Sequence, residues 1–501
     1  MHTLQWKELR LWLISHQAIE TSLKDASEIK RLDLSGLALD SLPESFSLLT
    51  ELVVLNLSNN ALTHLPDSFS SLQKLKNLDM RRNRLELFPA VLVELKLSSL
   101  NLSANKISDV SLLSQCSGLR VCDLSFNNLS ALCGHFDADN DLRTLNLSGN
   151  FFKTVPAGLQ NLNELQRLNL SQNMLTDVSS TLSHLGELLE INLSDNEISC
   201  IDESFFTLAL EEIELSGNAL ETLYLRGLEE LERLSVDENP LKKIEVDDDF
   251  APCLKEFSCD SCLLSKFVTF QSTDLESLCF SSNQITQVPE SIIKYENLSQ
   301  LDIDNNGISH LPYGMTNMSR LQVLYITDNP LSEEAKEVIK ILHPDICDIN
   351  MKTGISIDKA KEEDLRQMAE LIGVLFEVEK DFVINFDKQL SGITKLYTCE
   401  GADLLVAKHE GRVVGMVTMQ RLVSSAAGDY IGQIEDLVVD KEYRKMGVGS
   451  RLINKIRFIG LQEHAYKRVQ LAADMDNINA QSFYTRRGFR RTNLNVYHLD
   501  K

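Results

Sequence analysis

The sequence predicts an α/β protein in two parts, a long solenoid of short strands and turns followed by a mixed α/β domain. The pattern L-x-x-L-x-L-x-x-N-x-L recurs at intervals of 21 to 23 residues through the first two thirds of the 501-residue chain. After residue 350 this pattern stops, and strand-like segments alternate with helix-like segments around a glycine-containing turn. We therefore expect residues 1–350 and 351–501 to fold as separate domains.

The first domain is a repeat array in which 14 copies of the pattern can be aligned. Leu37 and Cys262 occupy the ninth position in two copies, and asparagine occupies it in the other 12 copies: Asn60, Asn83, Asn105, Asn127, Asn150, Asn173, Asn196, Asn218, Asn239, Asn283, Asn306 and Asn329. Each copy predicts a short strand with inward-pointing leucines and a turn whose buried asparagine bonds the backbone of adjacent coils. This is the pattern of the leucine-rich repeat, which stacks into a curved, horseshoe-like solenoid.

Both ends of the array require a cap, because an open end would expose apolar side chains. The segment 6–14, which contains Trp6, Leu9, Leu11, Leu13 and Ile14, predicts a helix before the first coil. Residues 332–342 predict a helix after the last coil, with Ser332 as its N-cap and two glutamates in its first turn. A short polar joint at 352–354 then leads into the second domain.

The residue between the second and third leucines of each copy is expected to face the concave side of the solenoid. These residues are mostly polar and partly acidic: Asp33, Asn56, Asp79, Asn101, Asp123, Asn146, Asn169, Asn192, Glu214, Ser235, Ser258, Cys279, Asp302 and Tyr325. Binding hot spots favour Trp, Tyr and Arg, and this stripe is nearly free of them. Two interpretations stay open: a solvated consensus face, or a docking surface for a basic protein or peptide.

Cys259-Asp260-Ser261-Cys262 has the spacing of half a zinc or redox site. No second cysteine pair accompanies it, and the two cysteines fall on a core leucine position and on the asparagine position of one copy. We therefore expect both to be structural and expect no metal site.

Charge limits the classes of partner. The chain holds 49 Lys and Arg against 73 Asp and Glu, of which 23 and 21 lie in residues 351–501, leaving 26 and 52 for the remainder. This acidity argues against nucleic acid and anionic membrane as partners. The first 14 residues include Lys7, Glu8 and Arg10, which no signal-peptide core would contain, and no apolar run approaches the roughly 20 residues of a membrane helix. We expect a cytoplasmic protein whose ten cysteines are reduced.

The turn Arg444-Lys445-Met446-Gly447-Val448-Gly449 joins an expected strand, 430–440, to an expected helix, 450–461. Glycine lets a backbone approach a ligand closely, and the first N–H groups of a helix are unpaired and carry partial positive charge. Such a turn suits a pyrophosphate.

Together with Asn477-x-x-Ala480-x-x-Phe483-Tyr484-x-x-x-Gly488-Phe489, this turn resembles motifs A and B of the GCN5-related N-acetyltransferase (GNAT) superfamily over residues 352–500. The expected order of strands and helices after residue 355 is also that of the family. The resemblance implies that acetyl-CoA is the co-substrate, that an amine is the acceptor, and that strands 435–439 and 469–473 splay apart so that the pantetheine arm pairs along the first. The implied cofactor-binding residues are Leu437, Val438, Val439, Arg444, Lys445, Met446, Gly447, Val448, Gly449, Ser450 and Asn477.

The resemblance also implies the catalytic residues. An alkylamine with a pKa of about 10.4 is mostly protonated at neutral pH, so a base has to take its proton. Glu435 is the candidate, as in the spermidine/spermine N-acetyltransferases that Glu435-Asp436 resembles, and Asp436 is the reserve. Tyr484 is the candidate acid for the departing thiolate, although a core role for it stays open, and the N–H of Val438 is the candidate donor to the oxyanion.

The sequence gives less information about the acceptor. Residues 375–382 lie in a region that lines the acceptor side in the family, and their carboxylates suit a cationic amine or a solvated helix end. Two functions therefore compete. One is an N-acetyltransferase acting on a small amine, polyamine or protein amine, with repeats that recruit a protein. The other is an interaction protein whose GNAT domain only binds acyl-CoA.

Overall fold

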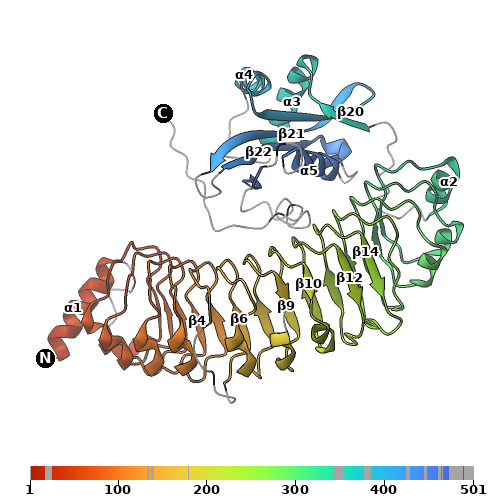
Figure 1. Ribbon diagram of the computed structural model, residues 1–501. Helices are drawn as coiled ribbons and strands as arrows, with labels where there is room; N and C mark the ends of the chain where they lie inside the picture. The colour runs from red at the N-terminus through yellow and green to blue at the C-terminus, as the bar shows by residue number, and fades with distance from the viewer. Residues whose placement is uncertain are drawn as a thin grey trace. The chain divides into compact units, whose positions relative to one another are not determined.

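The computed structural model describes residues 2–16, 18, 25–132, 136, 140–178, 180–342, 355–376, 385–424, 429–444, 448–460, 464, 466–472, 484 and 489 (Figure 1). The chain divides into two compact units, one built largely from the repeats and the other largely from the residues after 344. The strand Val323–Tyr325 is hydrogen-bonded into the repeat sheet and is described with it.

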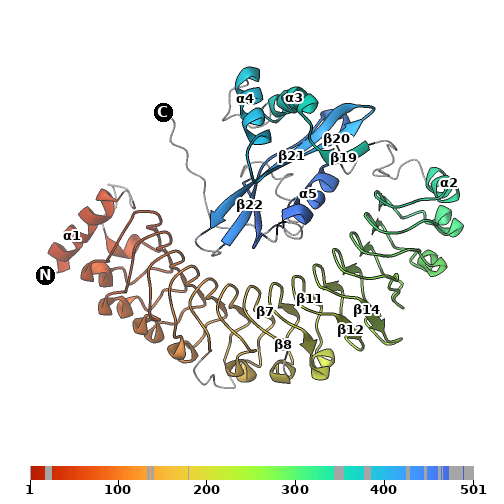
Figure 2. The same ribbon diagram turned by 45° about the horizontal axis from the view of Figure 1, so that its top comes forward.

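One strand from each coil enters a single 14-stranded parallel sheet, in chain order (Figure 2). The strands are β1 Arg31–Asp33, β2 Val54–Asn56, β3 Asn77–Asp79, β4 Ser99–Asn101, β5 Val121–Asp123, β6 Thr144–Asn146, β7 Arg167–Asn169, β9 Glu190–Asn192, β11 Glu212–Glu214, β13 Arg233–Ser235, β15 Glu256–Ser258, β16 Ser277–Cys279, β17 Gln300–Asp302 and β18 Val323–Tyr325. The middle residue of each strand is buried, as the repeat pattern predicts.

The return segments of the coils are of two kinds. Two short parallel pairs occur, β8 (Asp177–Val178) with β10 (Cys200–Ile201) and β12 (Thr222–Leu225) with β14 (Lys243–Val246). Nine described coils have a 3-10 helix, and in the coils of β8 and β10 it follows the short strand: Glu44–Leu48, Asp67–Ser71, Ala90–Glu94, Ser111–Gln115, Ala157–Asn161, Ser180–His184, Glu203–Thr207, Glu290–Lys294 and Tyr313–Asn317.

The asparagines of the ninth position tie neighbouring coils together, as expected from the sequence. Nδ2 of Asn83 donates to the carbonyl of Leu57 in the preceding coil at 2.9 Å and to that of Met80 in its own coil at 3.0 Å. Its Oδ1 accepts the N–H of Leu62 at 3.0 Å. The same three bonds recur at Asn127 and at the other asparagines of this row from Asn60 to Asn306. We call this row the asparagine ladder.

The concave stripe proves to be part of the coil's own hydrogen bonding. In ten coils the stripe side chain accepts the N–H of the residue two positions later, as in the 2.9 Å bond from Ser125 N–H to Asp123. The ten are Asp33, Asn56, Asp79, Asn101, Asp123, Asn146, Asn169, Asn192, Glu214 and Asp302. These acceptors shape the turn after each strand, which weakens the docking interpretation of the stripe.

In the coils of Ser258 and Cys279, whose side chains are too short to reach this amide, an aspartate from the preceding coil replaces them. Oδ1 of Asp237 accepts the N–H of Asp260 at 2.6 Å and the hydroxyl of Ser258 at 2.6 Å. Asp260 in turn accepts the N–H of Ser281 at 2.7 Å. Burial raises the pKa of the Asp237 carboxyl to about 6, helped by the charge of Glu214 and opposed by the two accepted bonds.

The paired cysteines at 259 and 262 are buried in the core of the array, as their repeat positions predict. Sγ of Cys262 lies 3.5 Å from the carbonyls of Val236 and Asp260, two of the positions that a ladder asparagine would bond. Burial raises the pKa of the Cys259 thiol well above its usual value, so this thiol is a poor nucleophile. Within the described residues, no group of three or more His, Cys, Asp or Glu side chains is placed to hold a metal ion.

Two helices flank the array. Helix α1 (His2–Ser15) buries Leu9 and Leu13, whereas Leu11 is 57% exposed and faces away from the core. Helix α2 (Glu333–Ile341) begins as predicted, because the Ser332 hydroxyl accepts the N–H of Ala335 at 3.2 Å. Among the described helices, none is long and apolar enough to cross a membrane.

The second unit is a five-stranded sheet with helices on both faces. Its elements are β19 (Ile355–Lys359), α3 (Leu365–Phe376), α4 (Phe386–Tyr397), β20 (Ala402–His409), β21 (Arg412–Ser424), β22 (Asp429–Val439), α5 (Val448–Phe458) and β23 (Val469–Leu471), with 3-10 turns at Glu362–Asp364 and Lys441–Tyr443. The strand order is β19-β20-β21-β22-β23, antiparallel except for the parallel pair β22 and β23. Helix α4 is capped by Asn385, whose side chain accepts the N–H of Lys388 at 3.0 Å.

Side chains of alternate strand residues form a buried cluster on each face of this sheet. Helix α5 covers one face, where Leu452 and Ile456 pack with Val417 and Ile434 in what we call the α5 cluster. Helices α3 and α4 cover the other face, where Met368 joins residues of β20, β21 and β22 in the α3/α4 cluster. The face of each β22 side chain can therefore be assigned from the cluster it joins.

The asparagine ladder gives a stability prediction. Asn127→Ala should destabilise the protein by about 2–4 kcal/mol, because two carbonyls and one N–H in the core lose their partner. Urea unfolding measures this difference. The matched control is the exposed neighbour in Asn128→Ala, which should change stability by less than about 0.5 kcal/mol; equal effects of the two substitutions would contradict the ladder's role.

Asp237 gives a pH prediction. Its pKa of about 6 in the folded protein lies above the ordinary value, so its stabilising contribution is largest in acid and is lost as the pH rises through 6. Asp237→Asn retains Oδ1, which accepts both bonds. We expect it to raise the unfolding midpoint by a few degrees at pH 7.5 and to have little effect at pH 4.5, measured by calorimetry at the two pH values. A midpoint lowered at pH 7.5 would contradict this account.

Candidate active site

The central feature of the second unit is a β-bulge in β22. Val417 of β21 pairs with Leu437, but Met419 pairs with Ile434, so that Thr418 alone lies opposite two residues, Glu435 and Asp436. A bulge of this kind inserts one residue and breaks the alternation of the strand.

The bulge places both carboxylates on one face of the sheet. Ile434 and Leu437 lie on either side of it, and both pack into the α5 cluster. Successive side chains of a strand point to opposite faces, so the residues next to them, Glu435 and Asp436, both lie on the α3/α4 face. Regular alternation would have separated the two carboxylates.

The two carboxylates differ in environment. Asp436 is largely buried and accepts the Thr418 hydroxyl at 3.1 Å, while its own N–H donates to the same oxygen at 3.2 Å. Burial raises the pKa of the Asp436 carboxyl to about 6, Thr418 lowers it, and the charge of Glu435 raises it. Glu435 is exposed, and none of the described residues forms a hydrogen bond or ion pair with it.

The bulge also changes which backbone groups face the edge of β22. Before it, the N–H of Gly432 donates to Arg468 on the β23 side at 2.9 Å. After it, the N–H of Asp440 donates to Val414 on the β21 side at 2.9 Å. Antiparallel bonds alternate, so the Val438 amide points toward β21, whereas those of Leu437 and Val439 point toward the β23 side.

Beyond the bulge, no strand that the structure describes pairs with that side of β22, which we call the open edge. In the described part of the chain, pairing with β23 ends at Ile434 and Leu471. The predicted splay of strands 435–439 and 469–473 stays a prediction, because the residues directly after Ala472 lie outside the described part of the chain. The orientation of Val438 corrects the prediction of its N–H as an oxyanion donor, because a bond to β21 uses that group; Leu437 and Val439 present theirs to the open edge.

The predicted anion-binding turn is described at its two ends. Arg444 is exposed, and its Nε donates to the Val439 carbonyl at 3.1 Å, on the open edge. Helix α5 begins at Val448, two residues before the predicted start, so Val448 and Gly449 belong to its first turn. Lys445, Met446 and Gly447 lie outside the described residues, as does the side chain of Ser450.

Residues of β21 and β19 position the start of α5. Gly415 of β21 has no side chain where Val448 and Leu452 approach, and a Cβ there would lie 3.0 Å from Val448. Arg451 and Lys455 donate to the carbonyls of Ile355 and Ile357 at 3.1 and 2.6 Å. Both contacts hold α5 against β19.

Tyr484 is partly buried and packs against the α5 cluster. Its ring lies 5.9 Å from that of Phe489 in an edge-to-face arrangement, and its carbonyl accepts the N–H of Phe489 at 3.0 Å. This packing is compatible with either predicted role. Asn477 lies outside the described residues.

Comparisons with known proteins match both parts of the chain. The model of the acetyltransferase (GNAT) family matches residues 374–489, and the leucine-rich repeat model matches residues 27–85 and 140–198. A glucosamine 6-phosphate N-acetyltransferase of Trypanosoma brucei brucei is 27% identical over 153 residues, which are 29% of this chain and 92% of that protein. The chain joins leucine-rich repeats to a GNAT acetyltransferase domain.

A second relative and a solved structure match the same two parts of the chain. The human N-acetyltransferase 8 is 28% identical over 109 residues, 22% of this chain, which spans about half of that protein (48%). The structure of a leucine-rich repeat protein of Leptospira interrogans covers 64% of this chain and 95% of its own, with a TM-score of 0.52 and 24% identity, and it shows the repeat fold.

The GNAT domain has a polar pair that the sequence analysis missed. Nε2 of Gln470 in β23 donates to Oε1 of Gln433 in β22 at 2.8 Å. Gln433 lies between Gly432 and Ile434, which both face the α5 side, so this pair shares the α3/α4 face with Glu435 and Asp436. Only the register of two distant strands brings the glutamines together, so the local sequence contains no signal for them. The predicted acidic segment, 377–382, lies outside the described residues.

Proposed function

We propose that this protein is an acetyl-CoA-dependent N-acetyltransferase whose repeats act as a protein-interaction or substrate-recruiting module. The main support is the bulge in β22, directly after which the strand edge has no partner among the described residues, beside two carboxylates on one face. An unpaired edge can accept an extended ligand by β-augmentation, and the carboxylates can accept a proton from an amine.

Acetyl-CoA would bind along the open edge and around the start of α5. In this proposal Leu437, Val438 and Val439 form the edge, and the amides of Leu437 and Val439 meet the thioester carbonyl and the pantetheine amides. Arg444, Lys445, Met446, Gly447, Val448, Gly449 and Ser450 surround the pyrophosphate at the start of the helix, where the N–H groups are unpaired. Asn477 contacts the pantetheine chain. No metal takes part.

The chemistry is acyl transfer from sulfur to nitrogen. The amine nitrogen attacks the thioester carbonyl, so that a C–N bond forms and the C–S bond breaks. Glu435 is exposed on the α3/α4 face, where we place the acceptor amine, and it accepts the proton that the amine loses. Tyr484 donates its hydroxyl proton to the departing thiolate. Asp436 stays on Thr418 and contributes the second negative charge.

The acceptor face suits an amine that is cationic before it reacts. Glu435 and Asp436 attract an ammonium group, and the Gln433 and Gln470 amides provide neutral hydrogen bonds beside it. Small amines, polyamines and protein amines all meet this description. A basic protein partner for the acidic coils and a cytoplasmic location complete the proposal.

Substitutions in the carboxylate pair test the base. Glu435→Gln should lower the rate of CoA release by about 10²-fold at pH 7 and recover partly near pH 10, where the free amine no longer needs a base. In the wild type, the rate should fall as the pH drops through about 6, because Asp436 gains a proton there. Rates would be measured with a thiol reagent across polyamines, amino acids and basic peptides.

Asp436→Asn separates the two roles. If Asp436 only adds charge, this variant should lose the acidic limb near pH 6 and should have, at pH 8, the reduced rate that the wild type shows below pH 6. Loss of activity at every pH, with Glu435→Gln unaffected, would transfer the role of base to Asp436.

Tyr484→Phe tests the acid. We expect a loss of about 10² in turnover with nearly unchanged binding of acetyl-CoA, because only the proton donor is removed. Phe489→Leu is a suitable packing control, since it perturbs the ring that Tyr484 contacts but leaves the hydroxyl. Unchanged turnover in Tyr484→Phe would leave Tyr484 a core residue, and binding without CoA release from any amine would favour an acyl-CoA-binding interaction protein.

A further inference from the structure

The two halves of the repeat array differ in charge at the second and third positions of the repeat, directly before and at the start of each strand. The first seven coils have only basic charges at these positions: Lys30, Arg31, Lys76, Arg120, Arg143 and Arg167. The last seven have six acidic and two basic residues there: Glu190, Glu211, Glu212, Glu232, Arg233, Lys255, Glu256 and Glu276. The array is acidic overall, but this row of positions is divided into a basic half and an acidic half.

The two halves also differ in how their charges are balanced. In the acidic half, both cations are paired within the row, Arg233 with Glu212 at 2.7 Å and Lys255 with Glu232 at 2.6 Å. Arg167, at the boundary, pairs with Glu190 at 2.9 Å. The other five cations of the basic half make no salt bridge with any residue that the structure describes. Like charges at neighbouring positions of one row repel each other, and a ligand of opposite charge would offset this repulsion.

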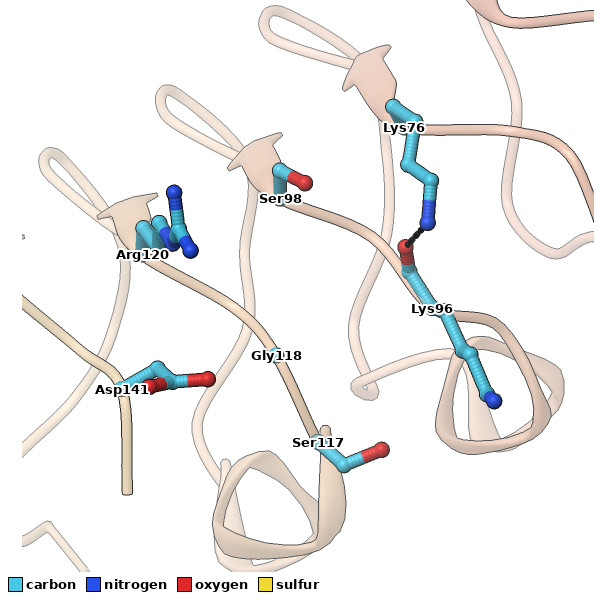
Figure 3. Close-up of a pocket in the computed structure, with 7 residues that line it drawn as sticks. All are labelled: Lys76, Lys96, Ser98, Ser117, Gly118, Arg120 and Asp141. Carbon is cyan, nitrogen blue, oxygen red and sulfur yellow. Dashed lines mark hydrogen bonds between the residues drawn. The ribbon is translucent and has the colours of Figure 1, made fainter. Parts of the chain in front are cut away.

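Part of this basic half surrounds a hollow of about 420 Å³ (Figure 3). Its lining comes from four successive coils and consists of Lys76, Lys96, Ser98, Ser117, Gly118, Arg120 and Asp141. Nζ of Lys76 donates to the Lys96 carbonyl at 2.9 Å, which holds the ammonium group against the wall of the hollow. Lys96 and Arg120 are exposed, and Figure 3 shows Ser98 between Arg120 and Lys76, with Ser117 at the lower edge of the lining. Three cations and two hydroxyls with one carboxylate favour an anion.

The spacing of the cations favours an extended anion over a compact one. Lys76, Arg120 and Arg143 stand at the same position of the third, fifth and sixth coils, and neighbouring strands of a sheet are about 4.8 Å apart. The cations therefore follow one another along the array and do not converge on a single point. A peptide with carboxylates at intervals matches such a row, whereas one phosphate reaches only part of it.

We propose that the basic half of this row, centred on Lys76 and Arg120, binds an extended, carboxylate-rich peptide segment of a partner protein. Exposed cations form several weak ion pairs with such a segment, and their complementarity selects the partner more than it strengthens the complex. For this half of the array the proposal differs from both interpretations of the stripe, a solvated face and a docking surface for a basic protein or peptide. It is independent of the acetyltransferase chemistry.

The test uses the full-length protein and a fluorescein-labelled peptide of eight glutamates flanked by Gly-Ser. Fluorescence anisotropy should show binding that weakens as salt rises, since the contacts are exposed ion pairs. The double substitution Lys76→Glu/Arg120→Glu should weaken binding by about tenfold or more, because two attractions become repulsions. Thermal melting of both proteins checks that the variant is folded.

A matched control separates this site from the effect of net charge. Lys106→Glu/Lys153→Glu changes the charge by the same amount at exposed lysines outside the row and should leave the affinity within about twofold. Equal weakening in both variants, or no weakening in the first, would overturn the proposal. So would displacement of the peptide by equimolar inorganic phosphate, which would indicate a phosphate site, or equal binding of an eight-glutamine peptide.

Discussion

The residue inserted in β22 exchanges the sides of the strand toward which alternate N–H groups point. Both parts of the candidate active site depend on this exchange. Before the bulge, the amides on the outer side of β22 bond β23; after it, Leu437 and Val439 face that side with no described strand beside them. The same insertion brings Glu435 and Asp436 onto one face. A binding edge and a proton acceptor thus result from one local irregularity, and the clusters around α3, α4 and α5 hold it in place.

The sequence predicted what depends on local periodicity. The repeat fixed the 14 strands, the role of Asn83 and its equivalents, and the burial of Cys259 and Cys262. It did not predict the bulge, because that depends on how Thr418, 17 residues earlier than Glu435, aligns with β22. The error at Val438 follows from the same limit, since it depends on which neighbour takes a hydrogen bond.

The polar residues of the array fall into two groups that composition cannot distinguish. One group, which includes Asp123 and Asp237, accepts backbone amides and shapes the coils. The other, which includes Lys76 and Arg120, leaves its charges to solvent. Acidic character therefore overstates how much of the array is available to a basic partner, because several carboxylates are already used by the fold. Charged side chains that do not hydrogen-bond the backbone of the coils are the better guide to which partner the array binds.

The asparagine ladder has a consequence for how such an array changes during evolution. Each asparagine joins its own coil to the one before it through the same three bonds, so any coil can follow any other. Duplication or loss of a whole coil preserves every bond, whereas loss of a few residues breaks a set of them. The number of coils, and with it the distance between the basic and acidic halves, can thus vary by whole units without redesign of the core.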